Sequence, residues 1–477
     1  MRTRLCYLAL ILVPLVVYAT AWFGDYGTAA DFLRLDAASR DLVATDHARE
    51  GILNGALLDV SFAFVSDVAD FRFARMLGVL LLVLCGLALW QLLERGGWSE
   101  FDATAAALSV VLLPTAQLTA GWGTTWPGTL AALLSLAGFA AVESELEQGG
   151  GRRVIAMLGG VLLYLAAAMC YFPGAIMALV PLAGLGFVRP ARLWSETQKW
   201  FFSHVGLLLF GVLGAWLLER TMMSEAGVAD SSSLVQRLLD LATHALPLAW
   251  APYLAAASEP MHLLCVALAL VVLVGLLFAI RQRSAADVRV GNAWKLVLGG
   301  AILIFCVVAL LSPNWRSSYR SLWPMAGVAI IALVAAVRGL SDQTGGRPFW
   351  HHAAMVGIVA VGALAAFGQV HGLIAEPLSA EWASLRTAVL RANFPSEARV
   401  QLELPENKSG HDGAAARFEG RVAEHPEAAE QMFNAAMQAR YPSGLPKGHR
   451  FSVEVGPAGA APAEGVLVFD LAKPVTH

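Results

Sequence analysis

The chain has 477 residues, of which 57% are hydrophobic and 14% are charged, and its mean hydropathy is +0.61. A soluble domain averages roughly 45–50% apolar and about 25% charged residues, so a water-soluble fold could not cover its surface with so few charges. The formal net charge of −3 excludes the basic face that a nucleic-acid-binding protein needs. The composition therefore predicts an integral membrane protein.

A membrane-spanning helix needs roughly 20 mostly apolar residues, and about eleven segments meet that requirement. In chain order they cover about 5–22, 76–93, 103–120, 127–143, 154–171, 173–188, 201–218, 261–280, 296–312, 322–338 and 352–370. The first segment follows Arg2 and Arg4 and ends at small residues, as a cleaved secretory signal does. Its apolar core is nearly long enough to span, however, so we expect it to remain as the first helix. An all-α polytopic domain over residues 1–370 follows.

Lysine and arginine residues are unevenly distributed among the loops, which predicts the orientation of the chain. The loops that would share a side with the N-terminus carry most of them, whereas the short loops at 119–126 and 171–173 carry none. Because basic loops stay in the cytoplasm, the N-terminus is predicted to be cytoplasmic. An odd number of spans then places the C-terminus in the periplasm of a bacterial cell, with the chain in the inner membrane.

Two predicted outer loops, about 23–75 and 219–260, are too long to be simple turns. In the first loop, apolar residues recur at helical spacing from Ile52 to Val60, which predicts a helix along the membrane surface. In the second loop, the run from Leu234 to Leu239 has a similar pattern.

The tail over residues 371–477 has the pattern of a small α/β domain. Amphipathic stretches predict helices at about 381–393 and 422–440. Alternating apolar residues predict strands near Val400–Leu404, Phe451–Val455 and Val466–Phe469. The tail has no cysteine and no catalytic signature, and the orientation makes it periplasmic.

Asp25 follows the first predicted helix by a few residues, which places its carboxylate at the membrane–water boundary. A carboxylate there suits a general base that deprotonates an acceptor hydroxyl. The alternative is a hydrated loop residue or a helix cap. Asp31 fits a cap or a solvent-facing charge better than a catalytic role.

Arg316 and Arg320 bracket Tyr319 in the predicted outer loop before the tenth span. Two guanidinium groups four residues apart share a helix face and could hold a phosphate through bidentate hydrogen bonds. The alternative is ordinary snorkelling to lipid head groups. Arginine on the outer side runs against the charge bias, which favours a function.

Arg72 and Arg75 begin the second predicted helix beside acidic residues, where they suit either phosphate binding or local ion pairing. The run Tyr171–Pro173 is most simply a tight turn at the interface. The five cysteines lie in or beside apolar runs, which argues against a disulfide framework or a zinc cluster. We find no Walker loop, nucleophile elbow or His-Glu-x-x-His motif, which argues against an ATP-driven pump and a protease.

The predicted spans contain almost no charged residues. Ion-coupled transporters usually keep an ionisable group at bilayer depth, whereas here such groups gather in the outer loops. Any chemistry is therefore expected at the outer face.

This layout resembles bacterial GT-C membrane glycosyltransferases, and most closely the O-antigen-modifying glucosyltransferases of the GtrII type. Three short motifs carry the resemblance: Asp25-Tyr26 after the first helix, Tyr171-Phe172-Pro173, and Ser318-Tyr319-Arg320-Ser321-Leu322 entering a late helix. The tandem acidic pair often seen after the first helix is missing, because Tyr26 follows Asp25.

The resemblance implies transfer of a hexose such as glucose from a polyprenyl-phosphate donor to a periplasmic glycan or lipid acceptor. Asp25 would be the base, and Arg316, Tyr319 and Arg320 would bind the donor phosphate. Asp31, Arg72 and Tyr171 are accessory candidates. No cofactor is implied with certainty, and metal dependence stays open because GT-C enzymes differ in it. The alternatives are a transporter or flippase of lipid-linked sugars, and a non-catalytic membrane scaffold.

Overall fold

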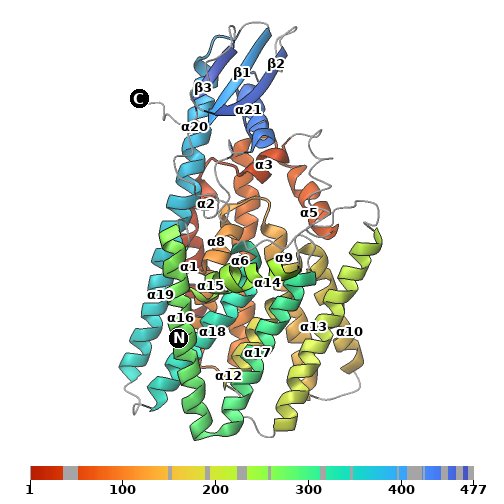
Figure 1. Cartoon of the computed structure of the whole chain (residues 1–477), viewed down its shortest axis with the longest axis vertical. Coiled ribbons are helices and arrows are strands. Elements are labelled where there is room, and N and C mark those ends of the chain that lie inside the picture. The colour runs from red at the N-terminus through yellow and green to blue at the C-terminus, as the bar shows by residue number, and fades with distance from the viewer. Residues whose placement is uncertain are drawn as a thin grey trace.

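The computed structural model is mostly helical, with long helices running side by side and a small sheet at one end (Figure 1). It describes residues 2–35, 52–148, 153–188, 194–222, 234–255, 259–311, 319–343, 348–394, 397–404, 422, 425–441, 450–457 and 466–470. We call the end that carries the sheet the sheet end.

The helices of the first half are α1 (Arg2–Val17), α2 (Ala19–Phe23), α3 (Ala29–Leu33), α5 (Ile52–Phe62), η1 (Val68–Asp70), α6 (Phe71–Arg95), α7 (Glu100–Val111), α8 (Pro114–Gly121), α9 (Trp126–Gln148), α10 (Arg153–Cys170), α11 (Phe172–Ala175), η2 (Ile176–Ala178), α12 (Leu179–Val188) and α13 (Trp194–Met222). The later elements are α14 (Leu234–Asp240), η3 (Leu241–Ala245), α15 (Leu246–Trp250), α16 (Glu259–Ala286), α17 (Val288–Leu311), α18 (Tyr319–Gln343), α19 (Pro348–Gln369), η4 (Val370–Ala375), α20 (Glu376–Arg391), β1 (Glu397–Leu404), α21 (Pro426–Arg440), β2 (Arg450–Pro457) and β3 (Val466–Asp470).

Within the described residues, seven helices are long and apolar enough to cross a membrane, namely α6, α9, α13, α16, α17, α18 and α19. The bent pair α7 and α8 would make an eighth span, and α1, α10 and the α11–α12 stretch are shorter apolar helices. These helices make the chain a multi-pass membrane protein, as its composition predicts. The eleven predicted segments fall on these same helices, but a count of eleven needs every shorter one to cross, so the count stays a prediction.

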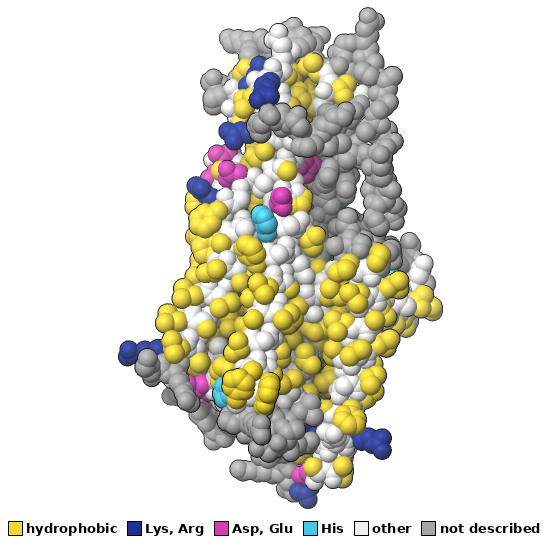
Figure 2. Space-filling model, turned by 90° about the vertical axis from the view of Figure 1, so that its left-hand side faces the viewer, with side chains coloured by type: hydrophobic (Ala, Val, Ile, Leu, Met, Phe, Trp, Pro, Cys, Tyr) yellow, Lys and Arg dark blue, Asp and Glu magenta, His cyan; other side chains and the backbone are white. Residues whose placement is uncertain are grey.

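The outer surface of the helices is apolar where a bilayer would contact it. Figure 2 shows hydrophobic side chains over the helical part of one face, with charged side chains gathered toward its two ends. Large exposed side chains on three different helices include Phe210, Val271 and Leu364, which are 70%, 68% and 75% exposed. Such a surface is unfavourable in water and favourable against lipid.

The third predicted span is broken near its middle. Helix α7 ends at Val111 and α8 begins with Pro114, and their axes differ by 60°. Proline has no N–H, so the carbonyl of Val110 loses the donor that it would have in a continuous helix. The bend also turns the neighbouring carbonyls away from their helical partners.

Around α8, several backbone carbonyls have no N–H partner within a helix, and side chains donate hydrogen bonds to them instead. The pairs are Trp323 Nε1 to Val110 (3.1 Å), Tyr18 Oη to Val111 (2.6 Å), Gln117 Nε2 to Leu112 (3.2 Å), Tyr26 Oη to Gly121 (3.0 Å) and Thr125 Oγ1 to Trp122 (2.9 Å). An apolar bundle supplies no water, so buried irregular backbone must find its partners in the protein. We call residues 110–125, with these donors, the elbow.

The tail forms a parallel sheet in the order β2-β1-β3, with Val400 of β1 opposite Val453 of β2 and Leu467 of β3. Helix α21 lies between β1 and β2 in the chain, as a parallel crossover requires. The tail strands lie where the alternation predicts them. Helix α19 continues through η4 into α20 as one apolar helix over Phe349–Arg391, so the predicted domain boundary at residue 370 falls inside a helix.

We expect Tyr18→Phe to destabilise the protein, because the change leaves the Val111 carbonyl buried without its donor. An unsatisfied buried acceptor costs about 1–3 kcal/mol. Thermal unfolding of the purified protein in detergent should show a lower midpoint. Tyr7→Phe in the preceding helix α1 is the matched control, because Tyr7 is 43% exposed. Equal midpoints for the two variants would contradict the role of the elbow.

Candidate functional site

Asp25 is an exposed residue of the loop directly after α2, at the edge of a hollow of about 370 Å³. Trp382 and Arg386 of α20 line this hollow together with Asp25. A second hollow of about 370 Å³ shares these three residues and is lined further by Ser66 and Gln438. Segments from the first loop, α20 and α21 therefore meet around this carboxylate, and an exposed carboxylate beside a hollow can reach a bound molecule.

Asp31 is fully buried, unlike Asp25, and forms a capping box at the start of α3. The Thr28 N–H donates to Asp31 Oδ2 (2.9 Å), and the Asp31 N–H donates to Thr28 Oγ1 (3.3 Å). Burial raises the pKa of the Asp31 carboxyl, although hydrogen bonds from Thr28 and Gly123 and the charge of Arg75 act in the opposite direction. Of the two alternatives that the sequence left open, a cap or a solvent-facing charge, the structure shows the first: Thr28 is the N-cap and Asp31 completes the capping box.

Arg320 stacks on Tyr171, with the guanidinium carbon 4.4 Å from the ring centroid. The two residues come from different parts of the chain: Tyr171 lies in the tight turn between α10 and α11, and Arg320 is the second residue of α18. Of the turn predicted at 171–173, only Tyr171 lies outside the helices, because Phe172 and Pro173 already begin α11. Arg316 lies outside the described residues. Tyr319 is only 1% exposed, and its hydroxyl donates to the carbonyl of Leu254 (3.4 Å), so it faces the protein interior.

The segment that leads from α8 into the first turn of α9 contacts both Asp31 and Tyr171. On one side, Asp31 Oδ2 accepts a hydrogen bond from the Gly123 N–H (3.4 Å). On the other side, the ring of Tyr171 packs so closely on Gly128 that a Cβ there would lie 3.2 Å from the ring. Only five positions separate Gly123 from Gly128 along the chain, so both groups border one short segment.

The two arginines near the start of α6 differ in their surroundings. Arg72 is exposed, with its guanidinium carbon 5.0 Å from the ring centroid of Phe73. Arg75 is fully buried, so the structure gives it no access to a phosphate at the surface.

Sequence reasoning missed a buried ionisable pair on the membrane-spanning helices α9 and α13. Glu143 Oε2 lies 2.7 Å from His204 Nε2 and accepts a hydrogen bond from Trp200 Nε1 (2.8 Å). Glu143 and His204 are 6% and 2% exposed, and His204 also stacks on Phe139. The expectation of almost no ionisable groups inside the spans is therefore incomplete. The sequence does place Glu143 and His204 within two predicted spans, which is a signal for buried ionisable groups. Nothing in the sequence indicates that the two side chains contact each other.

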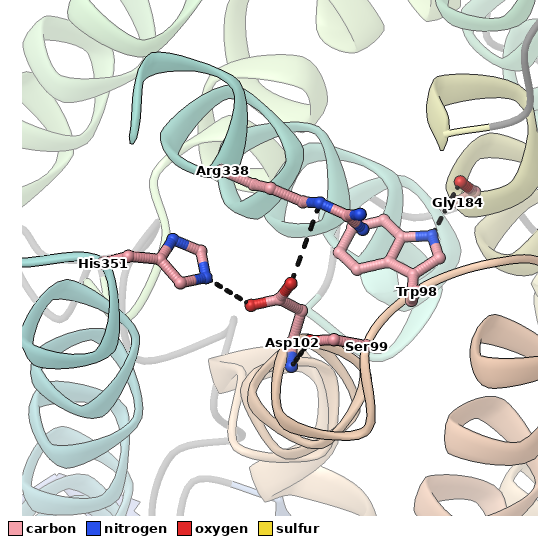
Figure 3. Close-up of polar contacts among 6 residues, drawn as sticks. All are labelled: Trp98, Ser99, Asp102, Gly184, Arg338 and His351. Atoms are coloured by element: carbon pink, nitrogen blue, oxygen red, sulfur yellow. Dashed lines mark hydrogen bonds and ion pairs between the residues drawn. The ribbon is translucent and has the colours of Figure 1, made fainter. Parts of the chain in front are cut away.

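A second polar cluster lies at the end of the bundle opposite the sheet end, where α18 ends and α19 begins. Figure 3 shows Asp102 of α7 between Arg338 and His351. Asp102 Oδ1 lies 2.6 Å from His351 Nε2, and Asp102 Oδ2 lies 3.7 Å from Arg338 Nε. Trp98 faces Arg338, and its Nε1 donates to the carbonyl of Gly184 (2.9 Å). These contacts tie three helices together and lie far along the bundle from Asp25.

No group of three or more His, Cys, Asp or Glu side chains within the described residues is arranged to hold a metal ion. Metal dependence therefore stays open, as it does in the sequence.

No protein-family model matches the chain, and no curated protein sequence is significantly similar to it. Among solved structures, the archaeal oligosaccharyltransferase AglB from Archaeoglobus fulgidus, in complex with an inhibitory peptide and a dolichol-phosphate, is 11% identical with a TM-score of 0.43, over 87% of this chain and 64% of that one. ArnT from Cupriavidus metallidurans bound to undecaprenyl phosphate is 12% identical with a TM-score of 0.45, over 89% and 87%.

The chain spans a little under two thirds of the length of the archaeal oligosaccharyltransferase, between 62% and 64% in its three structures. All these TM-scores lie below 0.5, so the likeness carries no argument about activity.

Proposed function

We propose that the protein is a GT-C-type glycosyltransferase that moves a sugar, a hexose such as glucose, from a polyprenyl-phosphate donor to a glycan or lipid acceptor at the sheet end. The observation that carries the proposal is the placement of Asp25. It is an exposed carboxylate beside a hollow that three distant segments of the chain build together. The donor class and the sugar come from the resemblance of the sequence motifs.

Asp25 would act as the general base. Its carboxylate accepts the proton of the acceptor hydroxyl while the hydroxyl oxygen forms a bond to the anomeric carbon of the donor sugar. The bond from that carbon to the phosphate oxygen breaks, and its electron pair stays on the polyprenyl phosphate. Negative charge therefore grows on the phosphate during the reaction.

Arg320 would hold that phosphate. A guanidinium group near the leaving oxygen stabilises the growing negative charge and orients the donor through bidentate hydrogen bonds. Stacking on Tyr171 at 4.4 Å restricts where the guanidinium can lie. Arg316 is the second proposed phosphate ligand, on sequence grounds alone. Because Tyr319 is buried, its part would be to anchor the start of α18.

We propose further that the protein lies in a bacterial inner membrane, with its N-terminus in the cytoplasm and the sheet end in the periplasm. The distribution of basic residues supports this orientation. The helix that leaves the bundle as α20 carries Trp382 and Arg386 to the hollow, so the tail would lie on the same side as the chemistry.

A transporter or flippase of lipid-linked sugars is the second candidate, and the Glu143–His204 pair favours it. Ionisable groups buried in spans often belong to ion or proton pathways. Such a transporter would need a phosphate ligand but no general base, so Asp25 separates the two functions.

We expect Asp25→Asn to reduce transfer by about 10²–10⁴-fold without lowering thermal stability, because it removes a base from an exposed position. The measurement is mass spectrometry of the envelope glycan in deletion cells that express each variant, normalised to folded protein. Asp31→Asn is the comparison variant, and it should lower the unfolding midpoint because it weakens a buried capping box. Full transfer by Asp25→Asn would exclude the proposed base.

We expect Arg320→Ala to reduce transfer per folded molecule by about 10²–10³-fold, because a fixed cation at the leaving phosphate is lost. Arg320→Lys keeps the charge without the bidentate fork, so its defect should be smaller. Arg220→Ala is the control, since Arg220 lies over the ring of Trp216 on α13 in a similar stack. If Arg320 only anchors the helix in lipid, its alanine variant will lower the amount of folded protein and leave turnover intact.

The orientation predicts the behaviour of a fused alkaline phosphatase, which is active only outside the cytoplasm. The enzyme fused after His477 should be active, because the charge distribution places the tail in the periplasm. A fusion after Ala286, at the turn between α16 and α17, should be inactive. The reverse pattern would invert the proposed topology.

A further inference from the structure

We propose that Arg75 is a positioning residue for Asp25. It binds the backbone on both sides of Asp25 and so determines where that carboxylate lies. The inference rests on the proposed function, in which Asp25 is the general base.

The guanidinium group of Arg75 donates to three carbonyl groups of the segment that carries Asp25. Arg75 Nε donates to Ala21, Nη2 to Gly24 and Nη1 to Tyr26, each at 2.6 Å. Arg75 is fully buried, so water does not compete for these donors. Charge-assisted hydrogen bonds are roughly twice as strong as neutral ones, and these three flank Asp25 directly.

The segment around Asp25 is folded closely about this guanidinium group. The Arg75 guanidinium carbon lies 4.0 Å from the ring centroid of Tyr26, which is itself held to the elbow through its hydroxyl. Burial raises the pKa of Tyr26 to about 12, so the hydroxyl keeps the proton that it donates. Gly24 permits the turn, because a Cβ there would lie 2.8 Å from the Tyr26 ring.

Among the residues that the structure describes, the side chain of Asp25 finds no polar partner that could hold it. Within the described part of the chain, no hydrogen bond or ion pair involves its carboxylate. Its position relative to the hollow therefore depends on the backbone of residues 21–26, and Arg75 is the side chain that binds this backbone at three points. A base must lie within hydrogen-bond reach of the proton that it takes, so this restraint bears on the rate.

Binding three carbonyls requires the guanidinium group of Arg75, because its nitrogen donors lie in one rigid plane and point in different directions. Lysine keeps the charge but offers a single nitrogen, so it cannot reach carbonyls of residues 21, 24 and 26 in the same way. Arg75→Lys is therefore the informative variant. Gly24→Ala disturbs the same segment without changing Arg75, and Arg95→Lys, at the exposed far end of α6, is the matched control.

The experiment makes two measurements on the full chain in nanodiscs. The first is hydrogen exchange of the backbone amides over residues 18–30. The second is the kinetics of sugar transfer from one fixed polyprenyl-phosphate hexose donor to envelope glycan isolated from deletion cells. In Arg75→Lys and Gly24→Ala, exchange should rise by about tenfold or more, because the segment opens locally. The kcat should fall by roughly 10²-fold, the effect of misplacing a catalytic group by about 1 Å, while the donor KM changes less than about twofold. Arg95→Lys should change none of these quantities.

Unchanged exchange in Arg75→Lys would overturn the proposal, and so would raised exchange with unchanged kcat, which would make Arg75 a purely structural residue. An equal rise in donor KM would place Arg75 in donor binding instead, and would also overturn it. Failure of the proposed function has a different signature: the unmodified chain would show no transfer and Asp25→Asn would behave like it, whatever the exchange data show.

Discussion

The backbone of the elbow must be satisfied inside an apolar bundle, and the arrangement of both halves of the candidate site depends on this constraint. The proline at the start of α8 removes one helical donor, and the 60° bend displaces others. Tyr18 and Trp323 replace them, and Tyr26 donates to the last carbonyl of α8. Tyr18 and Tyr26 flank α2, and Trp323 lies on the first turns of α18, so these hydrogen bonds hold the start of the first loop and the start of α18 to the elbow. A need for hydrogen bonds thus brings Tyr26 and Trp323, almost 300 positions apart in the chain, to the same short segment.

Buried charges show the same dependence on partners. Glu143 and His204 lie within spanning helices, and Asp102 lies between Arg338 and His351 where α7, α18 and α19 meet. An isolated charge in these surroundings would be costly, whereas a hydrogen-bonded pair is tolerated. Arg75 is the extreme example, since it is fully buried and its donors bind backbone carbonyls. These residues therefore specify which helices and loops can lie together, in a bundle whose apolar surfaces are otherwise similar.

The long helix that runs from α19 into α20 links the membrane-spanning part to the tail. It contacts Asp102 through His351 at one end and carries Trp382 and Arg386 to the hollow beside Asp25 at the other. The tail is therefore joined to the bundle by a continuous helix and by the packing of its elements around the first loop, including the contact of Phe32 with Trp382 at 5.9 Å between ring centroids.

The sequence by itself determined the features that depend on neighbouring residues. Apolar runs located the helices of a multi-pass membrane protein and alternation located the tail strands, because each of these is a property of a short stretch of chain. Only the tertiary structure decided which groups are buried and which partners they find. It distinguished the buried Arg75 from the exposed Arg72, paired Glu143 with His204, and brought Tyr171 under Arg320. Burial and pairing arise between segments far apart in the chain, where the energy of a contact depends on the folded surroundings and not on local spacing.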